Sequence, residues 1–262
     1  VFRTLEPYEK ADVDIDIIQL APIAIYNFVS RDLMTDLPAP DEFDPENPPD
    51  SLVILSTGTD TTDLVITNGY RVWQRSIPIG GNHFTRQLTK ELKLTFAKAE
   101  HLKRNARQAE DPKKVFQAMR SVFNDLVTEV QRSVNFFQSI DRQASIKGVV
   151  MLGNTTRLPG LQQYLGKNLG MEVIKFEKFN NLEGSAVVSS PAFKDNMPAF
   201  GVSYGLCLQG LNDSHLHTNL LPKEIITDRI VESKKPWAVA AVAALMLACS
   251  FNFFFHFIIW SG

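Results

Sequence analysis

The chain has 262 residues, of which 44% are hydrophobic and 21% charged, so it can bury a substantial core and form more than one subdomain. Its formal net charge of −2 argues against a nucleic-acid-binding protein, which would carry a strongly basic surface. Only two cysteines occur, Cys207 and Cys249, which excludes a disulfide framework and fits a reducing compartment. Because the first residue is Val1 rather than methionine, we expect further sequence upstream.

The first 51 residues are expected to contain the end of one subdomain and a linker. Residues 13–30 begin with strand-like alternation and continue with a helical pattern that is broken near Pro22. We interpret residues 1–34 as the last elements of a subdomain that begins upstream. Residues 35–51 are acidic and rich in proline, a composition that favours a solvated linker because it cannot form a packed core.

Residues 52–81 contain three apolar or alternating runs separated by turn residues, a pattern that predicts three consecutive antiparallel strands. The first turn contains Gly58, which allows close backbone approach, together with Thr59, Thr61 and Thr62. Their hydroxyl groups and the nearby amides are suited to surround a phosphate. An ordinary threonine-rich hairpin turn is the alternative, because short glycine motifs often occur by chance.

Three helices are predicted after the strands. Gly80 and Gly81 let the chain turn into a helix over residues 84–94, and Thr95 is suited to cap the next one. A long third helix is predicted over residues 112–140, with an apolar stripe that indicates core packing.

The helix after Thr95 carries Glu100 and Lys103, which are three residues apart and share one face. The default interpretation of such a pair is a surface ion pair.

An apolar strand is predicted over residues 146–152, followed by a glycine loop and a helix over residues 161–169. A strand that runs through a glycine loop into a helix N-terminus is suited to bind a nucleotide, although it is also a common structural turn. A further strand is predicted over residues 171–176, and a closing helix over residues 198–211.

Four of these segments, taken together, resemble the motifs of actin-like ATPases, which have a ribonuclease H-like α/β fold. Residues 56–63, Ser-Thr-Gly-Thr-Asp-Thr-Thr-Asp, resemble the second phosphate motif, and residues 79–82, Ile-Gly-Gly-Asn, resemble the glycine pair. The helix with Glu100 and Lys103 resembles the ribose-contacting helix, and residues 152–160 resemble the adenosine loop. Their order and spacing imply a partial actin-like fold whose first phosphate motif lies upstream.

Within this superfamily, residues 129–133 and 157–161 look most like PilM, the cytoplasmic type IV pilus assembly protein related to the cell-division protein FtsA. The resemblance covers residues 1–211, with the later subdomains over residues 52–211. It implies ATP and Mg²⁺ as ligands and a nucleotide site formed by Gly58, Thr59, Thr61, Thr62, Gly80, Gly81, Glu100, Lys103, Gly153 and Asn154.

Two positions depart from the family pattern. Ser56 replaces the motif aspartate that helps to position metal and water, and Asn154 replaces the second glycine of the adenosine loop. Loss of a carboxylate removes an acceptor that can hold Mg²⁺ or a water molecule. We therefore expect nucleotide binding with weak or no hydrolysis, unless Asp60 or Asp63 compensates.

Residues 212–236 are expected to form a leader and a linker. Asn219, Leu220, Leu221 and Pro222 resemble the Asn-Leu-Leu-Pro motif that opens PilN, the inner-membrane partner whose leader docks on PilM. Docking within one chain and docking between neighbours are both compatible with the sequence. The alternative is an ordinary loop.

Residues 237–260 carry no charged residue and are long enough to cross a hydrocarbon layer of about 30 Å, with Trp237 and Trp260 at the interface positions. Lys234 and Lys235 precede this span and indicate that the soluble part is cytoplasmic, at the bacterial inner membrane. One face of the span carries small and polar residues and could contact a second copy or another pilus component, such as a PilN- or PilO-like protein. The alternative is that alanine is simply common in this span. That face comprises Ala240, Ala244, Ala248, Asn252 and His256.

The sequence thus favours a membrane-tethered, nucleotide-binding scaffold of type IV pilus or related secretion assembly. An active ATPase that switches the inner-membrane complex and an FtsA-like division anchor are the alternatives. The uninterrupted span disfavours the anchor, which would be expected to end in an interfacial amphipathic helix. No pattern indicates a catalytic triad or a metal cluster.

Overall fold

A computed structural model describes residues 2–39 and 41–261, and the chain divides into two compact units. Residues 19–217 form the first, here called the body, and residues 1–18 with 218–262 form the second, here called the tail unit. The body contains the helices α2 (Ala21–Phe28), α3 (Gly81–Leu92), α4 (Phe96–Arg104), α5 (Pro112–Ile140), α6 (Leu161–Leu169), α7 (Ser185–Val188), α8 (Pro191–Asn196) and α9 (Gly201–Gly210), the π-helix η1 (Val29–Leu33), the 3-10 helices η2 (Ala106–Gln108), η3 (Asn154–Arg157) and η4 (Met197–Phe200), and the strands β1 (Ser51–Thr57), β2 (Thr62–Thr67), β3 (Val72–Ile77), β4 (Ile146–Leu152) and β5 (Val173–Ile174). The tail unit contains α1 (Phe2–Lys10) and α10 (Lys223–Ser261).

The body is built on a five-stranded mixed sheet with the strand order β3-β2-β1-β4-β5. The first three strands pair in antiparallel fashion as predicted. Strand β4 pairs in parallel with β1, and β5 pairs in parallel with β4. In this register Ser56 lies opposite both Asp63 of β2 and Leu152 of β4. The ends of the two central strands therefore bring the first phosphate-like turn next to the glycine loop after β4.

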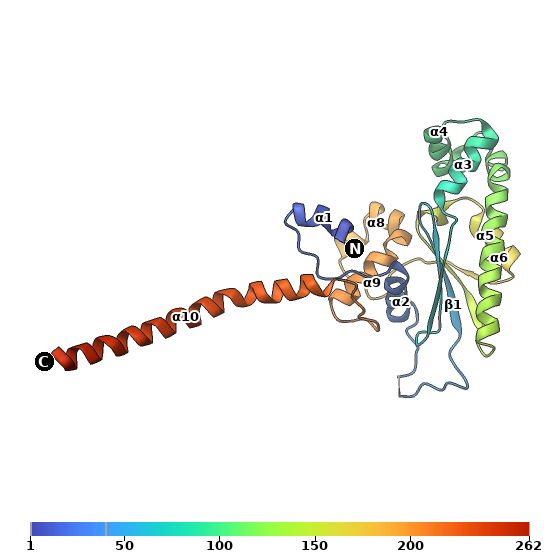
Figure 1. Cartoon of the computed structure of the whole chain (residues 1–262). Coiled ribbons are helices and arrows are strands. Elements are labelled where there is room, and N and C mark those ends of the chain that lie inside the picture. Colours follow the sequence, from blue (N-terminus) through green and yellow to red (C-terminus); the bar gives the residue numbers. More distant parts are fainter. Residues whose placement is uncertain (1, 40, 262) are drawn as a thin grey trace. The chain divides into compact units, whose positions relative to one another are not determined.

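Helices cover both faces of the sheet (Figure 1). On one face Leu55 and Leu64 pack with α5 and α6, and on the other Ile54 and Val65 pack with Phe28 of α2. Because successive side chains of a strand point to opposite faces, the apolar runs of β1 and β2 supply both cores. The sequence pattern of a strand buried on both sides is thus explained.

The residues that predicted helix starts from the sequence form capping hydrogen bonds in the structure. The Oγ1 atom of Thr95 accepts a hydrogen bond from the amide of Lys98, and the carboxylate of Asp111 accepts one from the amide of Lys114. Pro22 does not break a helix, because it lies in the first turn of α2, where a proline removes no helical hydrogen bond.

Two predicted strands are shorter or absent. Residues 13–20 form no strand, and β5 covers only Val173–Ile174 rather than residues 171–176. Residues 35–39 and 41–50 form neither helix nor strand. This segment nevertheless contacts the turn between β2 and β3. The ring of Phe43 packs against that of Tyr70 with centroids 4.5 Å apart, and the Arg71 guanidinium lies over the Phe43 ring.

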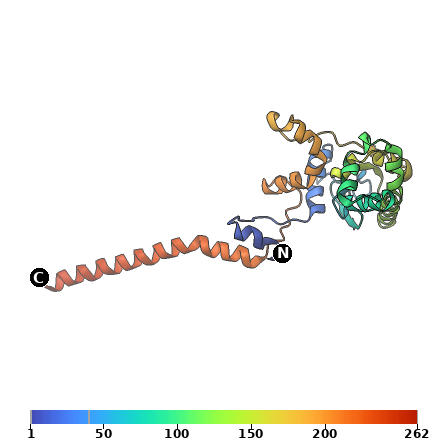
Figure 2. The same cartoon turned by 90° about the horizontal axis from the view of Figure 1, so that it is seen from above.

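The tail unit ends in α10, a single helix of 39 residues that appears continuous in both views (Figures 1 and 2). It contains the span predicted at residues 237–260 but begins at Lys223, well before Trp237. By length and composition this helix is apolar enough to cross a membrane. Pro236 lies inside it.

Candidate functional site

The first candidate site lies where two turns of the body pack directly against one another. The amide of Gly81 donates to the carbonyl of Gly58 at 2.9 Å, and the amide of Asn82 donates to the carbonyl of Thr59 at 2.7 Å. A Cβ atom on Gly80 would lie 2.7 Å from the backbone of Asp60, so the two turns approach too closely for a side chain at this position. Gly80 is therefore required by the packing of the α3 N-terminus on the hairpin turn, whereas a Cβ on Gly81 would come no closer than 3.3 Å to another atom.

The tip of the hairpin turn presents backbone donors to solvent. Thr59, Asp60 and Thr61 are exposed, and within the described part of the chain none of their amides donates a hydrogen bond. A concave turn with such amides suits an anion. The hydroxyl of Thr62, in contrast, is buried and donates to the carbonyl of Ile79 at 2.6 Å. It therefore stabilises the strand pair and does not face the tip.

The carboxylate of Asp60 is held at the side of this turn. It accepts hydrogen bonds from Asn82 and Arg86, each at 3.0 Å. The hydrogen bond from Asn82 lowers the pKa of Asp60, and the positive charge of Arg86 lowers it further. Asp60 therefore remains ionised next to the candidate anion site.

The glycine loop after β4 lies against the same turn. Gly153 has a φ of +87°, and a Cβ atom at this position would lie 2.3 Å from the carbonyl oxygen of Thr57. The hydroxyl of Thr155 lies 3.3 Å from the place that a Cβ on Gly81 would occupy. Gly58, Gly81 and Gly153 therefore lie at the junction of the same turns, and Asn154 follows Gly153 at an exposed position.

A charged network from α4 contacts the turn at Gly81. The Nζ atom of Lys103 contacts the carbonyl of Gly81 at 3.0 Å, the hydroxyl of Thr85 at 2.8 Å and a carboxylate oxygen of Glu100 at 2.6 Å. Partial burial alone would raise the pKa of Glu100, but hydrogen bonds from Lys103, Thr85 and Arg104 outweigh it and lower the pKa to about 2. Glu100 and Lys103 are therefore a fixed pair that supports the glycine turn.

The metal-binding position of the family pattern has no carboxylate in this chain. Ser56 occupies it, and Asp63 lies directly opposite on β2, with Ser76 of β3 beyond. Burial raises the pKa of Asp63, which weakens it as a ligand for Mg²⁺. Among residues 2–39 and 41–261 no group of three or more His, Cys, Asp or Glu side chains could hold a metal ion. The glycine turns fit a nucleotide phosphate better than this donor set fits a metal.

The second candidate site lies in the tail unit, where Asn219 is bonded to the segment before α2. The Oδ1 atom of Asn219 accepts the amide of Ile18 at 3.0 Å, and its Nδ2 atom donates to the carbonyl of Asp16 at 2.8 Å. The amide of Leu220 donates to the carbonyl of Ile18 at 2.8 Å. Two of these three bonds come from the Asn219 side chain, so the motif asparagine itself holds the contact.

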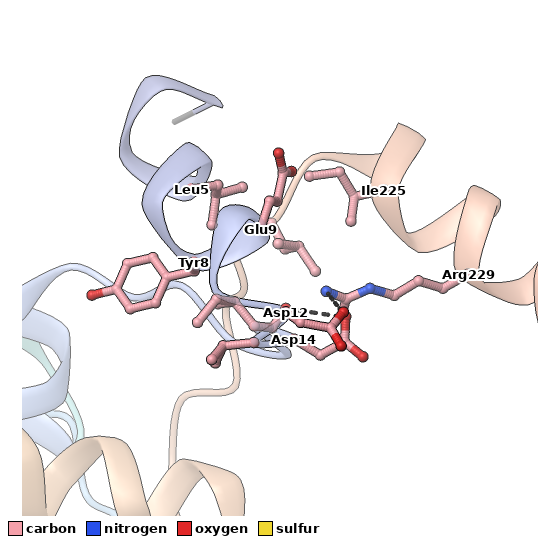
Figure 3. A pocket seen from close by; sticks show the side chains of 10 residues that line it. Leu5, Tyr8, Glu9, Asp12, Asp14, Ile225 and Arg229 are labelled. Atoms are coloured by element: carbon pink, nitrogen blue, oxygen red, sulfur yellow. Dashed lines mark hydrogen bonds and ion pairs between the residues drawn. The ribbon is translucent and has the colours of Figure 1, made fainter.

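Beside this contact, α1 and the start of α10 enclose a cavity of about 200 Å³, drawn in Figure 3. Leu5 and Leu221 are buried in its wall, and Ile225 of α10 lines it as well. The guanidinium of Arg229 pairs with Asp14 at 3.0 Å and donates to the carbonyl of Ile15 at 2.9 Å. The first turns of α10 therefore hold the Asn-Leu-Leu-Pro motif against residues 14–18.

Several of these residues were not expected from the sequence. At the first site, Thr155 lies beside Gly81 and Arg104 bonds to Glu100. At the leader contact, Asp16 bonds to Asn219 and to Arg229. Arg104 follows Glu100 by four residues, a spacing that could have indicated the pair. No local signal connects Arg229 with residues more than two hundred positions earlier.

Comparison with known proteins agrees with this fold. The family described as type IV pilus assembly protein PilM matches residues 6–211. The chain is similar to a solved structure titled PilM-PilN type IV pilus biogenesis complex, with 24% identity and a TM-score of 0.64 over 79% of this chain and 56% of that one. The chain therefore spans little more than half the length of that structure.

Two other solved structures share the fold at lower identity. The ethanolamine utilization protein EutJ from Carboxydothermus hydrogenoformans is 16% identical, with a TM-score of 0.51 over 75% of this chain and 57% of that one. MreB5 of Spiroplasma citri bound to ADP is 14% identical, with a TM-score of 0.50 over 80% of this chain and 65% of that one. The predicted actin-like α/β fold is confirmed.

Proposed function

The chain belongs to the PilM family of type IV pilus assembly proteins, and from this premise we propose that it is a membrane-tethered scaffold of pilus or related secretion assembly that binds a nucleotide. The observation that carries the nucleotide proposal is the convergence of the turns that contain Gly58, Gly81 and Gly153. The exposed amides at residues 59–61 would hold the phosphates. Glu100, Lys103 and the loop at Asn154 would hold the nucleoside, and ATP, with Mg²⁺, is the nucleotide that the family resemblance implies.

Hydrolysis is expected to be weak or absent because Ser56 supplies no carboxylate for Mg²⁺ or for a water molecule. When bound, the nucleotide would supply phosphate charge that locks the two turns together. Asp63, opposite Ser56, is the residue that favours the alternative of an active ATPase, since it is the nearest carboxylate in the register.

The test uses the full-length chain in detergent, with binding of a fluorescent ATP analogue and release of phosphate measured separately. We expect binding without significant turnover, and lost binding in Gly153→Ala. Ser56→Asp is expected to bind and to raise turnover. Absence of binding in the folded chain would contradict the nucleotide proposal. Turnover that disappears in Asp63→Asn would favour the ATPase.

We also propose that the Asn219-Leu220-Leu221-Pro222 leader docks within its own chain, on residues 14–18 and α1. The contacts of Asn219, Leu220 and Arg229 described above support docking in cis. A linked segment has an effective concentration in the millimolar range, so a weak peptide contact stays occupied. A PilN-like partner that presents the same motif would therefore have to compete with the internal leader.

This competition is measurable with a synthetic leader peptide and the full-length chain. We expect the peptide to bind poorly to the native sequence and at least tenfold more tightly to Asn219→Ala, whose own leader is weakened. Ser233→Ala, on an exposed position of α10, is the matched control. Equal peptide affinity in all three proteins would exclude a leader that occupies its own site.

In the proposed assembly α10 crosses the bacterial inner membrane, and the body stays in the cytoplasm on the side of Lys234 and Lys235. The face of Ala240, Ala244, Ala248, Asn252 and His256 would contact a second copy or a PilN- or PilO-like component. Leucine at both Ala244 and Ala248 is expected to reduce association in a membrane two-hybrid assay. Unchanged association would exclude this face.

A further inference from the structure

The body carries a groove that neither candidate site uses, between the first turns of α5 and the start of α6. Its volume is about 500 Å³, within the range of about 300 to 1,000 Å³ that is common for ligand sites. We call it the aromatic groove, because Phe116 and Tyr164 line it with ring centroids 6.0 Å apart. Pro112 and Pro159 complete its apolar lining.

Two cations border the aromatic groove. Lys113 and Arg120 are exposed, and within the described ranges neither side chain takes part in an ion pair or hydrogen bond. An aromatic floor with adjacent free cations suits a segment that combines carboxylates with proline rings. An acidic, extended peptide would therefore complement the lining of the groove.

This chain contains a segment with that chemistry. Residues 44–50, Asp-Pro-Glu-Asn-Pro-Pro-Asp, have three carboxylates, three prolines and no cation. They belong to the loop that precedes β1, and most of them are exposed. Proline also limits the conformational freedom that such a segment would lose on binding.

The segment cannot reach the groove of its own chain. Phe43, just before it, contacts Arg71, which pairs at 3.2 Å with Asp141, the residue after the last turn of α5. Ser51, just after it, donates its amide to the carbonyl of Ser145 at 2.7 Å. The groove lies at the opposite end of α5, a helix of 29 residues and so about 44 Å long. Figure 1 shows this loop at the end of the body away from α3 and α4.

We propose that the aromatic groove of one copy binds residues 44–50 of a second copy. Groove and segment are different surfaces at opposite ends of the body, so a single contact leaves one of each free. Repeated with the same rotation, such a head-to-tail contact builds an open chain of molecules or, if the rotation closes, a ring. This contact goes beyond the proposed function and uses none of the residues proposed to bind the nucleotide or of the leader, although Pro159 lies in the loop of residues 152–160.

Cross-linking between singly substituted chains tests the contact. In a Cys207→Ser, Cys249→Ser background, full-length Asn47→Cys and Gln117→Cys chains with different tags are mixed and treated with a short bismaleimide. We expect a cross-linked heterodimer, and a ladder of larger species when both cysteines are in one chain. Asn135→Cys is the control, because it lies eighteen residues after Gln117 on the same side of α5.

Charge reversal separates a specific contact from chance collision. Lys113→Glu with Arg120→Glu is expected to lower the heterodimer yield about tenfold, and Asp44→Lys with Glu46→Lys in the partner copy to restore it. Lys90→Glu with Lys167→Glu, which changes the net charge equally elsewhere, is expected to have no effect. The proposal is overturned if Asn135→Cys cross-links as well as Gln117→Cys, if the reversal leaves the yield unchanged, or if the double-cysteine chain cross-links only within itself.

Discussion

Truncation of Leu221 tests how firmly the leader is held in the tail unit. The Leu221 side chain is 7% exposed and lines the same cavity as Leu5 and Ile225, whereas that of Leu220 is 45% exposed. Replacement of a buried leucine by alanine costs roughly 2–3 kcal/mol at a partly enclosed site, from lost burial and the space left behind. Leu220→Ala should cost under about 1 kcal/mol.

Amide hydrogen exchange at Ile18 reports on this contact, since its N–H donates to the Asn219 side chain at 3.0 Å and neither variant alters Ile18 itself. A loss of 2–3 kcal/mol raises the undocked population by roughly 30- to 150-fold. Exchange at Ile18 should accelerate by that factor in Leu221→Ala and by less than about fivefold in Leu220→Ala. Similar acceleration in the two variants would refute the argument, because it would mean that burial of Leu221 does not hold the leader.

Three further predictions concern the body and are checked by urea unfolding of the full-length chain. Gly153→Ala should lower the free energy of unfolding by at least about 2 kcal/mol, since its Cβ would lie 2.3 Å from the Thr57 carbonyl. Gly170→Ala, where φ is +66° and the surrounding space is open, should lower it by only about 1 kcal/mol. Equal losses in the two variants would mean that the close approach at Gly153 is unimportant. The carboxylate of Glu100 has a pKa of about 2 in the folded chain against an ordinary 4.5, and this difference should stabilise the fold by up to about 3 kcal/mol at neutral pH. The contribution should be lost as the pH falls from about 5 to 2, and it should be missing in Glu100→Gln. Identical pH profiles of stability for the two proteins would contradict this prediction. Asp32→Asn should cost about 3 kcal/mol, because the buried carboxylate accepts the amides of Asn180 and Asn181 and the Tyr204 hydroxyl, and the exposed Asp36→Asn should cost almost nothing.

The sequence predicted the elements whose signals are local. Thr95 and Asp111 mark helix starts by their own side chains, and the Asn-Gly reversal marks the turn between β2 and β3. The order of the motifs also predicted that Gly153 lies near Gly58, and a Cβ on Gly153 would meet Thr57, the residue before Gly58. A strand, by contrast, needs a partner, and residues 13–20 have the alternation of a strand but pair with the leader through Asn219 and Leu220.

The roles of individual polar side chains were less predictable than the elements that carry them. Thr62 was expected to face phosphate, but its hydroxyl donates to the carbonyl of Ile79, which follows β3 two residues after Ile77, the strand partner of Thr62. Asp32 gave no sequence signal, since its partners are donors about 150 residues later in the chain. The role of a polar side chain depends on which polar groups tertiary packing buries beside it, because buried groups need hydrogen-bond partners. The local sequence pattern does not contain this information.

The continuous course of α10 has a mechanical consequence. Its 39 residues correspond to a rod of about 58 Å, and about 20 Å of it lies between Lys223 and Pro236, before the apolar stretch. A flexible tether of the same composition would absorb small displacements within its own fluctuations. A helix transmits them more directly, although Pro236, which lies between the apolar end and Arg229, removes one helical hydrogen bond and is the place where the rod can bend. A tilt of the apolar end would then act on Arg229, whose guanidinium bonds to Ile15.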